Sequence, residues 1–274
     1  MTAGDATIGE AARQPGAPAL RRLEAGRLRP ILLPLGTALA ALALWQLTVV
    51  LLRIPTVLVP APTDVARELV RDLPTLLRHA VPTGLESLAA FCIASALGIV
   101  LAFAITYSPL LRDMLYPNLV VFQLIPKIAL EPLFVIWLGI SSESRLAYAT
   151  FISFFPVVIA TSVGLASTER DALRLCRSLT ASTWQSFMLV RFPFALPHIF
   201  SGLKIAVTMA FIGVIVGEFI SAKAGLGFYI LYAGSRMETA SIFAAIFVLC
   251  VIGLALFGAV AGGERLARRW YRGY

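Results

Sequence analysis

Two residues of opposite charge, Lys127 and Glu131, lie four positions apart in an apolar stretch and are bracketed by Pro126 and Pro132. On a helix, residues four apart share one face, so these two side chains could form an ion pair. If the stretch spans a membrane, ionisable groups there are costly and usually face a cavity or a partner. Two interpretations follow: a solute pathway that includes Gln123, Lys127 and Glu131, or a structural ion pair.

Two further carboxyl groups lie near the ends of apolar stretches. Glu86 is about one turn inside its stretch, where a long side chain can reach the membrane surface. Glu218 precedes a Gly-containing loop and could hold an external gate or pair with Lys223. We therefore add Glu86 and Glu218 to the candidate solute pathway, with a surface-reaching or structural role as the alternative.

Enzymatic chemistry has little support in the chain. The phosphate-binding pattern G-x-x-x-x-G-K-[ST] and the metalloprotease pattern H-E-x-x-H are absent, and the protein has only two histidines. Its three cysteines, Cys92, Cys176 and Cys250, are far apart and show no metal-ligand spacing. We expect no catalytic residue, no metal and no cofactor in this chain.

The composition is that of an integral membrane protein. Of 274 residues, 59% are hydrophobic and 14% are charged, whereas soluble domains are less apolar and more charged. Several stretches approach the roughly 20 residues that a helix needs to cross a bilayer, and none shows the alternation of a barrel strand. The fold is therefore predicted to be all-α, with about six transmembrane helices near 31–52, 83–107, 115–139, 146–166, 199–220 and 241–262.

The segments outside these helices differ in kind. Residues 1–29 are rich in Ala, Gly, Pro and Arg, and we expect a disordered cytoplasmic tail before a transmembrane domain at 30–274. Residues 63–71 show helical spacing of apolar residues after a capping Thr63, which predicts a short amphipathic helix on the membrane surface. Residues 221–240 are predicted to form a loop.

The distribution of basic residues predicts the orientation. With the N-terminus inside, 14 of the 23 Lys and Arg residues fall in cytoplasmic segments and 7 fall outside. Basic residues gather in cytoplasmic loops, so both termini are expected in the cytoplasm. The net charge of +8 has the same explanation, and we expect no nucleic-acid partner.

The segment 168–198 is too polar to span a membrane but keeps a helical period. Leu173, Leu175, Cys176 and Leu179 give one face of a first short helix. Ser182, with Gln185 three positions later, has the pattern of a capping box at the start of a second. Two prolines, at 193 and 197, are expected to end that second helix before the next transmembrane span. The prediction is two short helices parallel to the membrane, joined by a turn at 179–182.

This segment resembles the EAA loop of binding-protein-dependent ABC importer permeases, whose pattern is Glu-Ala-Ala, three residues, Gly, nine residues, then Ile-x-Leu-Pro. The spacing is kept throughout, although the Glu and the Gly are both replaced. Arg174, Leu175 and Cys176 fall on Glu-Ala-Ala, Thr180 falls on Gly, Val190, Phe192 and Pro193 fall on Ile, Leu and Pro, and Leu179, Ala181 and Ser182 complete the turn. Residues 123–139, 195–204, 217–219 and 225–227 resemble the nitrate, sulfonate and taurine permease group, which also includes permeases for thiamin precursors and riboflavin.

The resemblance covers roughly residues 80–270 and implies the type I ABC importer permease fold, with 168–198 as the loop that couples to an ATPase. It implies a second permease copy, two cytosolic ABC ATPases that hold the ATP and Mg²⁺, and an external or periplasmic solute-binding protein. The subunit would lie among the lipids of the inner or plasma membrane and would not itself be an enzyme. Thr180 is a β-branched residue where the family has Gly, so either the turn has shifted or it is strained.

Two other classes of function remain open. A secondary transporter could couple to protons through Glu131 or Glu218, although such proteins usually have more spans and repeated halves. A scaffold without transport activity would not need charges in its spans. The sequence leaves the solute undetermined among sulfonates, nitrate, thiamin precursors, riboflavin and others.

Overall fold

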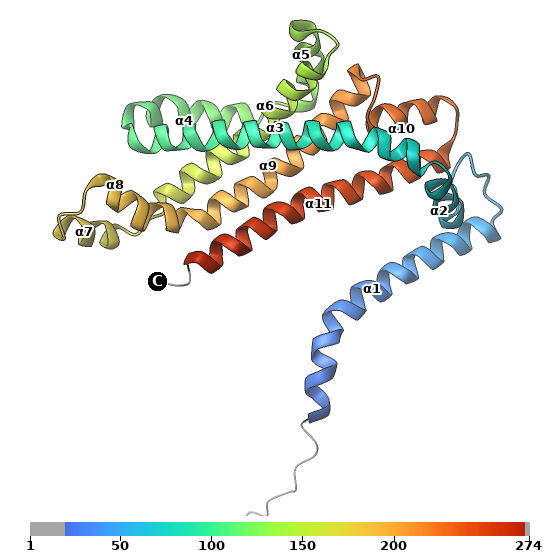
Figure 1. Cartoon of the computed structure of the whole chain (residues 1–274), viewed down its shortest axis with the longest axis horizontal. Helices are drawn as coiled ribbons and strands as arrows, with labels where there is room; N and C mark the ends of the chain where they lie inside the picture. The colour runs from blue at the N-terminus through green and yellow to red at the C-terminus, as the bar shows by residue number, and fades with distance from the viewer. Residues whose placement is uncertain (1–19, 272–274) are drawn as a thin grey trace, which may run out of the picture. The chain divides into compact units, whose positions relative to one another are not determined.

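The computed structural model describes the backbone of residues 20–271 and, except at 170 and 177, the side chains of 32–269. Every regular element in this range is a helix (Figure 1). In chain order these are α1 (Leu20–Leu51), α2 (Pro62–Arg71), α3 (Leu73–Tyr107), α4 (Pro109–Gln123), the 3₁₀ helix η1 (Lys127–Leu130), α5 (Glu131–Leu138), α6 (Ser142–Ala166), α7 (Arg170–Ser178), α8 (Thr183–Ser186), the π-helix η2 (Phe187–Arg191), α9 (Phe192–Ser221), α10 (Leu226–Ser235) and α11 (Thr239–Tyr271). The all-α prediction is confirmed.

The chain divides into two parts, residues 1–54 and residues 55–274. The first part contains α1, whose apolar segment Leu32–Leu51 has 20 residues, enough to cross a bilayer as a helix. The helix begins at Leu20, within the segment 1–29 that we expected to be disordered. The first 19 residues of that expected tail lie outside the described residues.

Six membrane crossings are consistent with the described helices. By length and composition, the segments within α1, α3, α6, α8–α9 and α11 are five candidate spans. Helix α4 and the segment Lys127–Leu138 qualify together as a sixth, although they bend by 96° at the break between them. The break lies between Gln123 and Lys127 and includes Pro126, which lacks the N–H that would continue the helical ladder.

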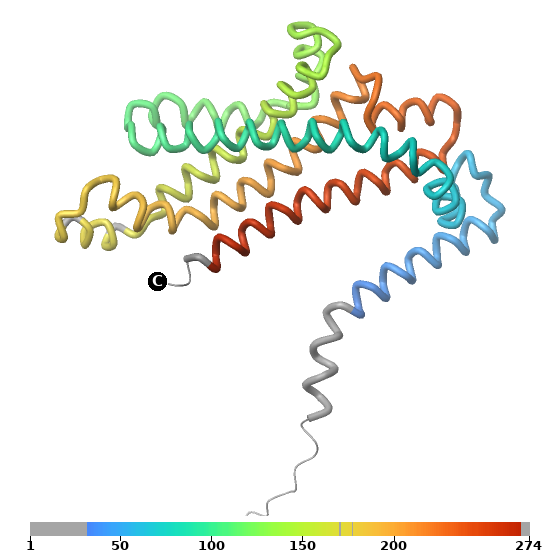
Figure 2. Tube along the Cα trace, in the orientation of Figure 1, coloured from blue at the N-terminus to red at the C-terminus, as the bar shows by residue number. Residues whose placement is uncertain are grey.

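Helix α6 is the centre of the second part and packs against both α3 and α9 (Figure 2). The close approach depends on small residues, as is usual between membrane helices. A Cβ added at Gly98 of α3 would lie 2.8 Å from the Val157 Cβ, and one added at Gly213 of α9 would lie 2.9 Å from the Ala149 Cα. Both glycines therefore allow the helix backbones to meet.

The bundle of the second part has two ends (Figure 1). Helices α7 and α8 lie at one end, which we name the loop end, and α2 and α10 lie at the other, which we name the α10 end. At the α10 end, Val65 and Leu69 of α2 pack on a buried cluster that includes Leu226, Tyr229 and Val248. The predicted helix at 63–71 is thus confirmed as α2, but it begins at Pro62 with Ala61 as its N-cap residue, so Thr63 does not cap it.

Two predictions about local structure were wrong. Pro193 and Pro197 do not end the helix before the next span, because α8, η2 and α9 follow one another without a break up to Ser221. Pro193 is the second residue of α9, directly after the π-helix η2, and the wider π turn accommodates its missing N–H within the continuous helix. The expected loop at 221–240 contains α10, a ten-residue helix.

Candidate functional site

The turn between α7 and α8 has a strained residue at its centre. Thr180 has a φ of 55°, in the left-handed region, which favours glycine and is poor for a β-branched residue. The Ala181 N–H donates to the Cys176 carbonyl at 3.0 Å, which is the long backbone bond of a Schellman helix ending. Thr180 therefore occupies the position where such an ending calls for glycine, and the turn has not shifted.

Helix α8 begins with the predicted capping box. The Gln185 N–H donates to the Ser182 hydroxyl at 3.1 Å, and the Ser182 N–H donates to the Gln185 side-chain oxygen at 2.8 Å. These reciprocal bonds satisfy two backbone donors that a helix start leaves free. The cap fixes the direction in which the chain leaves the strained turn.

The loop presents apolar side chains to its surroundings. Leu175, Leu179 and Trp184 are 61%, 70% and 66% exposed, although the loop around them is polar and contains the exposed ion pair of Arg174 with Asp171. The predicted apolar face of α7 is divided, because Cys176 is only half-buried whereas the two leucines are exposed. Exposed apolar residues on a polar loop mark a surface that another protein can cover.

A buried aromatic residue that the sequence analysis did not single out anchors this loop to the bundle. The Phe187 ring lies 5.3 Å from Phe103 and 5.8 Å from Tyr107 of α3, measured between ring centroids. It also contacts Trp184 on α8. Such aromatic pairs add to the apolar burial, so α8 is held firmly to α3. By contrast, Val190 and Pro193 lie beyond the turn, in the continuous helix that leads into α9.

Lys127 and Glu131 do not form the possible ion pair. Lys127 lies in the 3₁₀ helix η1 and Glu131 begins α5, so the α-helical spacing that would bring them together is absent. The Lys127 ammonium lies 5.2 Å from the centroid of the Phe155 ring, a distance at which a cation is attracted to an aromatic face. Gln123, at the end of α4, is exposed.

Glu131 is fully buried, and neither of its carboxyl oxygens has a hydrogen-bond partner among the described residues. The nearby Tyr148 is also fully buried, and its hydroxyl is likewise unpartnered. The two groups are close enough to interact electrostatically. Buried polar groups without partners are rare and costly, and Glu131 is the one carboxyl group among those that the described bundle contains.

Glu86 is paired across two helices. Its carboxylate accepts from the Arg145 guanidinium at 2.7 and 3.0 Å, the two-bond geometry that arginine forms with carboxylates. Arg145 also donates to the carbonyl oxygens of Ser141 and Ser221, so a single side chain ties α3, α6 and α9 together at the α10 end. The sequence did not indicate this pair, because its members are 59 positions apart.

Glu218 is buried and holds the start of α10. Its carboxylate accepts from the Thr83 hydroxyl at 2.6 Å and from the Gly227 N–H at 2.7 Å. Thr83 in turn accepts from the Leu226 N–H at 2.9 Å. The carboxylate therefore caps a helix N-terminus, where negative charge is favourable, and its described partners do not include Lys223.

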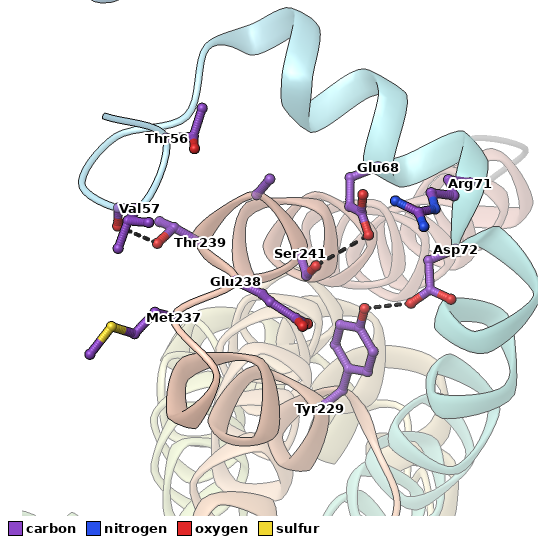
Figure 3. A pocket seen from close by; sticks show the side chains of 11 residues that line it. Thr56, Val57, Glu68, Arg71, Asp72, Tyr229, Met237, Glu238, Thr239 and Ser241 are labelled. Carbon is purple, nitrogen blue, oxygen red and sulfur yellow. Dashed lines mark hydrogen bonds between the residues drawn. The ribbon is translucent and has the colours of Figure 1, made fainter. Parts of the chain in front are cut away.

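A polar cavity of about 490 Å³ opens between α2 and the turn that joins α10 to α11 (Figure 3). Three carboxylates, Glu68, Asp72 and Glu238, line it together with Arg71. The Tyr229 hydroxyl donates to Asp72. Burial, and then this bond, raise the pKa of the Tyr229 phenol, so it remains a donor at neutral pH. The α10 end thus presents an acidic hollow.

Comparisons with known proteins agree with this arrangement. Residues 94–268 match the family described as "Binding-protein-dependent transport system inner membrane component". The chain is 34% identical over 227 residues to a "Probable ABC transporter permease protein" of Haemophilus influenzae, covering 83% of this chain and 93% of the relative.

Two relatives with named solutes are also similar. The formylaminopyrimidine transport permease protein ThiX of Halalkalibacterium halodurans is 31% identical, covering 85% of this chain and 93% of the relative. The taurine transport system permease protein TauC of Escherichia coli is 29% identical, covering 89% and 91%. In fold, the chain resembles the MetNI methionine ABC transporter in an inward-facing conformation, with a TM-score of 0.62 and 15% identity over 71% of this chain and 97% of that one.

Proposed function

The chain belongs to the family of binding-protein-dependent transport system inner membrane components, and on that premise we propose that it lines a solute pathway together with a second copy of itself. It is an ABC importer permease subunit with the type I fold, as the resemblance in sequence predicted. In the proposal, two cytosolic ATPases bind at the loop ends, and an external binding protein delivers the solute at the α10 ends.

The α7–α8 loop carries this proposal. Its apolar residues Leu175, Leu179 and Trp184 are exposed for a partner, while Phe187 anchors the loop to α3. The loop also leads directly into α9 through an unbroken helix. When an attached ATPase moves, the loop would therefore move as a rigid unit and shift α3 and α9 with it. Two-state transitions are transmitted between sites by such movements of packed elements. ATP and Mg²⁺ would be held by that ATPase.

The orientation follows from the same assignment. If the loop end meets the cytosolic ATPase, both chain termini lie on the cytoplasmic side and the acidic hollow around Asp72 and Glu238 opens outward. That hollow is then the surface that meets the binding protein. The solute itself is left open, because the named relatives transport different compounds.

Reconstitution tests this function. The chain would be co-expressed with its cognate ABC ATPase, placed in vesicles and supplied with its binding protein. We expect a complex with two permease copies and two ATPases, and uptake that requires both ATP and the loaded binding protein. Uptake driven by a proton gradient without ATP would favour a secondary transporter. A stable complex that transports nothing under either condition would favour a scaffold.

A further inference from the structure

A second cavity, of about 560 Å³, lies at the loop end among residues of α3, α4, α6, α7 and η2. Arg112 and Arg191 line it, together with Tyr116, Ser162, Thr106 and Thr168, and none of its lining residues is acidic. Neither arginine forms an ion pair with any side chain that the structure describes. The cavity therefore has a net positive lining.

The hydroxyl groups among the lining residues differ in whether their protons are already used in hydrogen bonds. Thr106 already donates its hydroxyl proton to the Ala102 carbonyl in α3, and Thr168, just after α6, donates to the Leu165 carbonyl. Ser162 does not: it is 6% exposed, and its hydroxyl has no hydrogen-bond partner among the described residues. A buried hydroxyl normally has a partner, and Ser162 is one of the residues that line this cavity.

We propose that this cavity binds a tetrahedral oxyanion, a phosphate or a sulfonate group, through Arg112, Arg191 and Ser162. Guanidinium groups favour such anions because they donate several hydrogen bonds in a fixed plane. Both cations converge on the cavity from different elements, Arg112 from α4 and Arg191 from η2. The serine hydroxyl supplies one further donor from the buried side.

Because of where the cavity lies, a bound anion would link elements next to the α7–α8 loop. Leu173 of α7 also lines it, so an anion there would join the ends of α4 and η2 beside the start of the loop. The anion has two possible sources, the phosphate of a lipid headgroup in the adjacent leaflet or a free anion from solution. Both share the same chemistry, and the inference does not depend on the transport assignment.

The test uses the full chain in nanodiscs, with the midpoint of thermal unfolding and calorimetric titration as readouts. One arm adds inorganic phosphate or sulfate to discs of phosphatidylcholine, with chloride at equal ionic strength as the reference. The other arm replaces part of the phosphatidylcholine with phosphatidylglycerol and adds no free phosphate. We expect stabilisation above the reference in at least one arm, and the arm identifies the source of the anion.

Variants make the test specific to the cavity. Arg112→Gln and Arg191→Gln should each weaken anion binding about tenfold or more, since each removes a charge-assisted contact, and Ser162→Ala should weaken it a few-fold. Arg269→Gln removes one positive charge at the same end, outside the cavity, and should bind as the unmodified chain does. All four positions lack side-chain partners in the described structure, so folding should persist, which circular dichroism checks.

Three outcomes would overturn the proposal. These are no stabilisation in either arm, unchanged binding in the Arg112→Gln/Arg191→Gln double variant, and an equal loss in Arg269→Gln. The last would mean general attraction to a basic surface rather than a site. Uptake assays are not part of this test, so its failure leaves the proposed transport function standing.

Discussion

The hydroxyl of Thr83 donates to the carboxylate of Glu218 at 2.6 Å, 135 positions later in the chain, and both residues also accept from backbone N–H groups at the start of α10. His79 contributes in the same way, since its ring nitrogen accepts from the Gly225 N–H at 3.1 Å. Three side chains from two long helices thus satisfy the N-terminal donors of a short one. This explains how a ten-residue helix, marginal by itself, stays in place at the α10 end.

A substitution at Gly225 should break this arrangement. Gly225 has a φ of 111°, and a Cβ there would lie 2.1 Å from the Glu218 Oε1. We expect Gly225→Ala to lower the unfolding free energy by roughly 2 kcal/mol or more, from backbone strain and crowding together. The measurement is thermal unfolding in detergent.

Gly258→Ala is the matched control for that change. Gly258 is an exposed position in α11 where a Cβ would meet nothing within 4 Å. Because alanine is the better helix former, this variant should be neutral or slightly stabilised. If the two alanine variants unfold at the same temperature, the contact between Gly225 and Glu218 is not as close as described.

The pairing of Glu86 with Arg145 leads to a second prediction. The pair is mostly buried, with side-chain exposures of 17% and 11%, and removing one partner of such a pair leaves the other charge without compensation. We expect Glu86→Gln to lower the unfolding free energy by about 2–3 kcal/mol. In a double-mutant cycle with Arg145→Gln, the double variant should lose less unfolding free energy than the two single variants lose together.

An exposed ion pair offers the comparison. Arg67 pairs with Asp64 on α2, but the arginine side chain is 75% exposed. Arg67→Gln should therefore change the unfolding free energy by less than about 1 kcal/mol. Strictly additive losses for Glu86→Gln and Arg145→Gln would show that the two side chains do not interact in the folded protein.

The sequence predicted the elements that depend on neighbouring residues and missed those that depend on contacts between residues far apart in the chain. Helix α2 and the capping box of Ser182 with Gln185 depend on residues three or four apart, so their patterns are visible in the sequence. Helix α10 was missed because His79 and Thr83, 146 and 143 positions away from their α10 partners in the chain, help to hold it in place. For Glu86 the sequence suggested either the solute pathway or the membrane surface, since nothing nearby identifies Arg145 as its partner. The role of Pro193 was predicted wrongly because the sequence pattern alone does not distinguish a proline near the start of a helix from one just after a helix end.

Glu131 gives a third prediction, with separate readouts for stability and function. A buried carboxyl group without a partner is destabilising by about 1–3 kcal/mol, so Glu131→Met should raise the unfolding free energy. If the carboxyl group serves the solute pathway, the same variant should lose uptake while its expression and ATPase binding persist. This is the expected result, because a costly buried group in a span usually has a function.

Lys127→Met separates the two members of the candidate pathway. Lys127 is partly buried against Phe155 and has no ion pair with Glu131, so its loss should leave the stability gain of Glu131→Met unchanged. Normal uptake in the Lys127→Met/Glu131→Met double variant would reject the solute-pathway assignment for both residues. Their role would then be confined to the structure around the break before α5.

The fourth prediction concerns the strained turn of the α7–α8 loop, the proposed coupling element. Thr180 adopts a left-handed φ at the end of α7, which costs roughly 1–3 kcal/mol for such a residue. Thr180→Gly should relieve that strain and raise the unfolding free energy by about 1 kcal/mol. Met237→Gly is the matched control for stability, since Met237 also has a left-handed φ of 57° but lies in the turn between α10 and α11.

Coupling between the ATPase and transport should depend on Ala181 and Ser182 at the turn of this loop and not on added charge in general. We expect Thr180→Gly to keep or increase the ATPase activity that the loaded binding protein stimulates. Ala181→Glu and Ser182→Arg put bulk and charge where the ATPase would dock, and Ser182→Arg also removes the cap of α8, so both should reduce stimulated activity and uptake together. Leu266→Arg places a charge at a 70% exposed position at the same end of the bundle and should leave coupling intact. If the two tip variants behave as Leu266→Arg does, the ATPase does not work through this loop, and the mechanism must be assigned to another contact of the loop end.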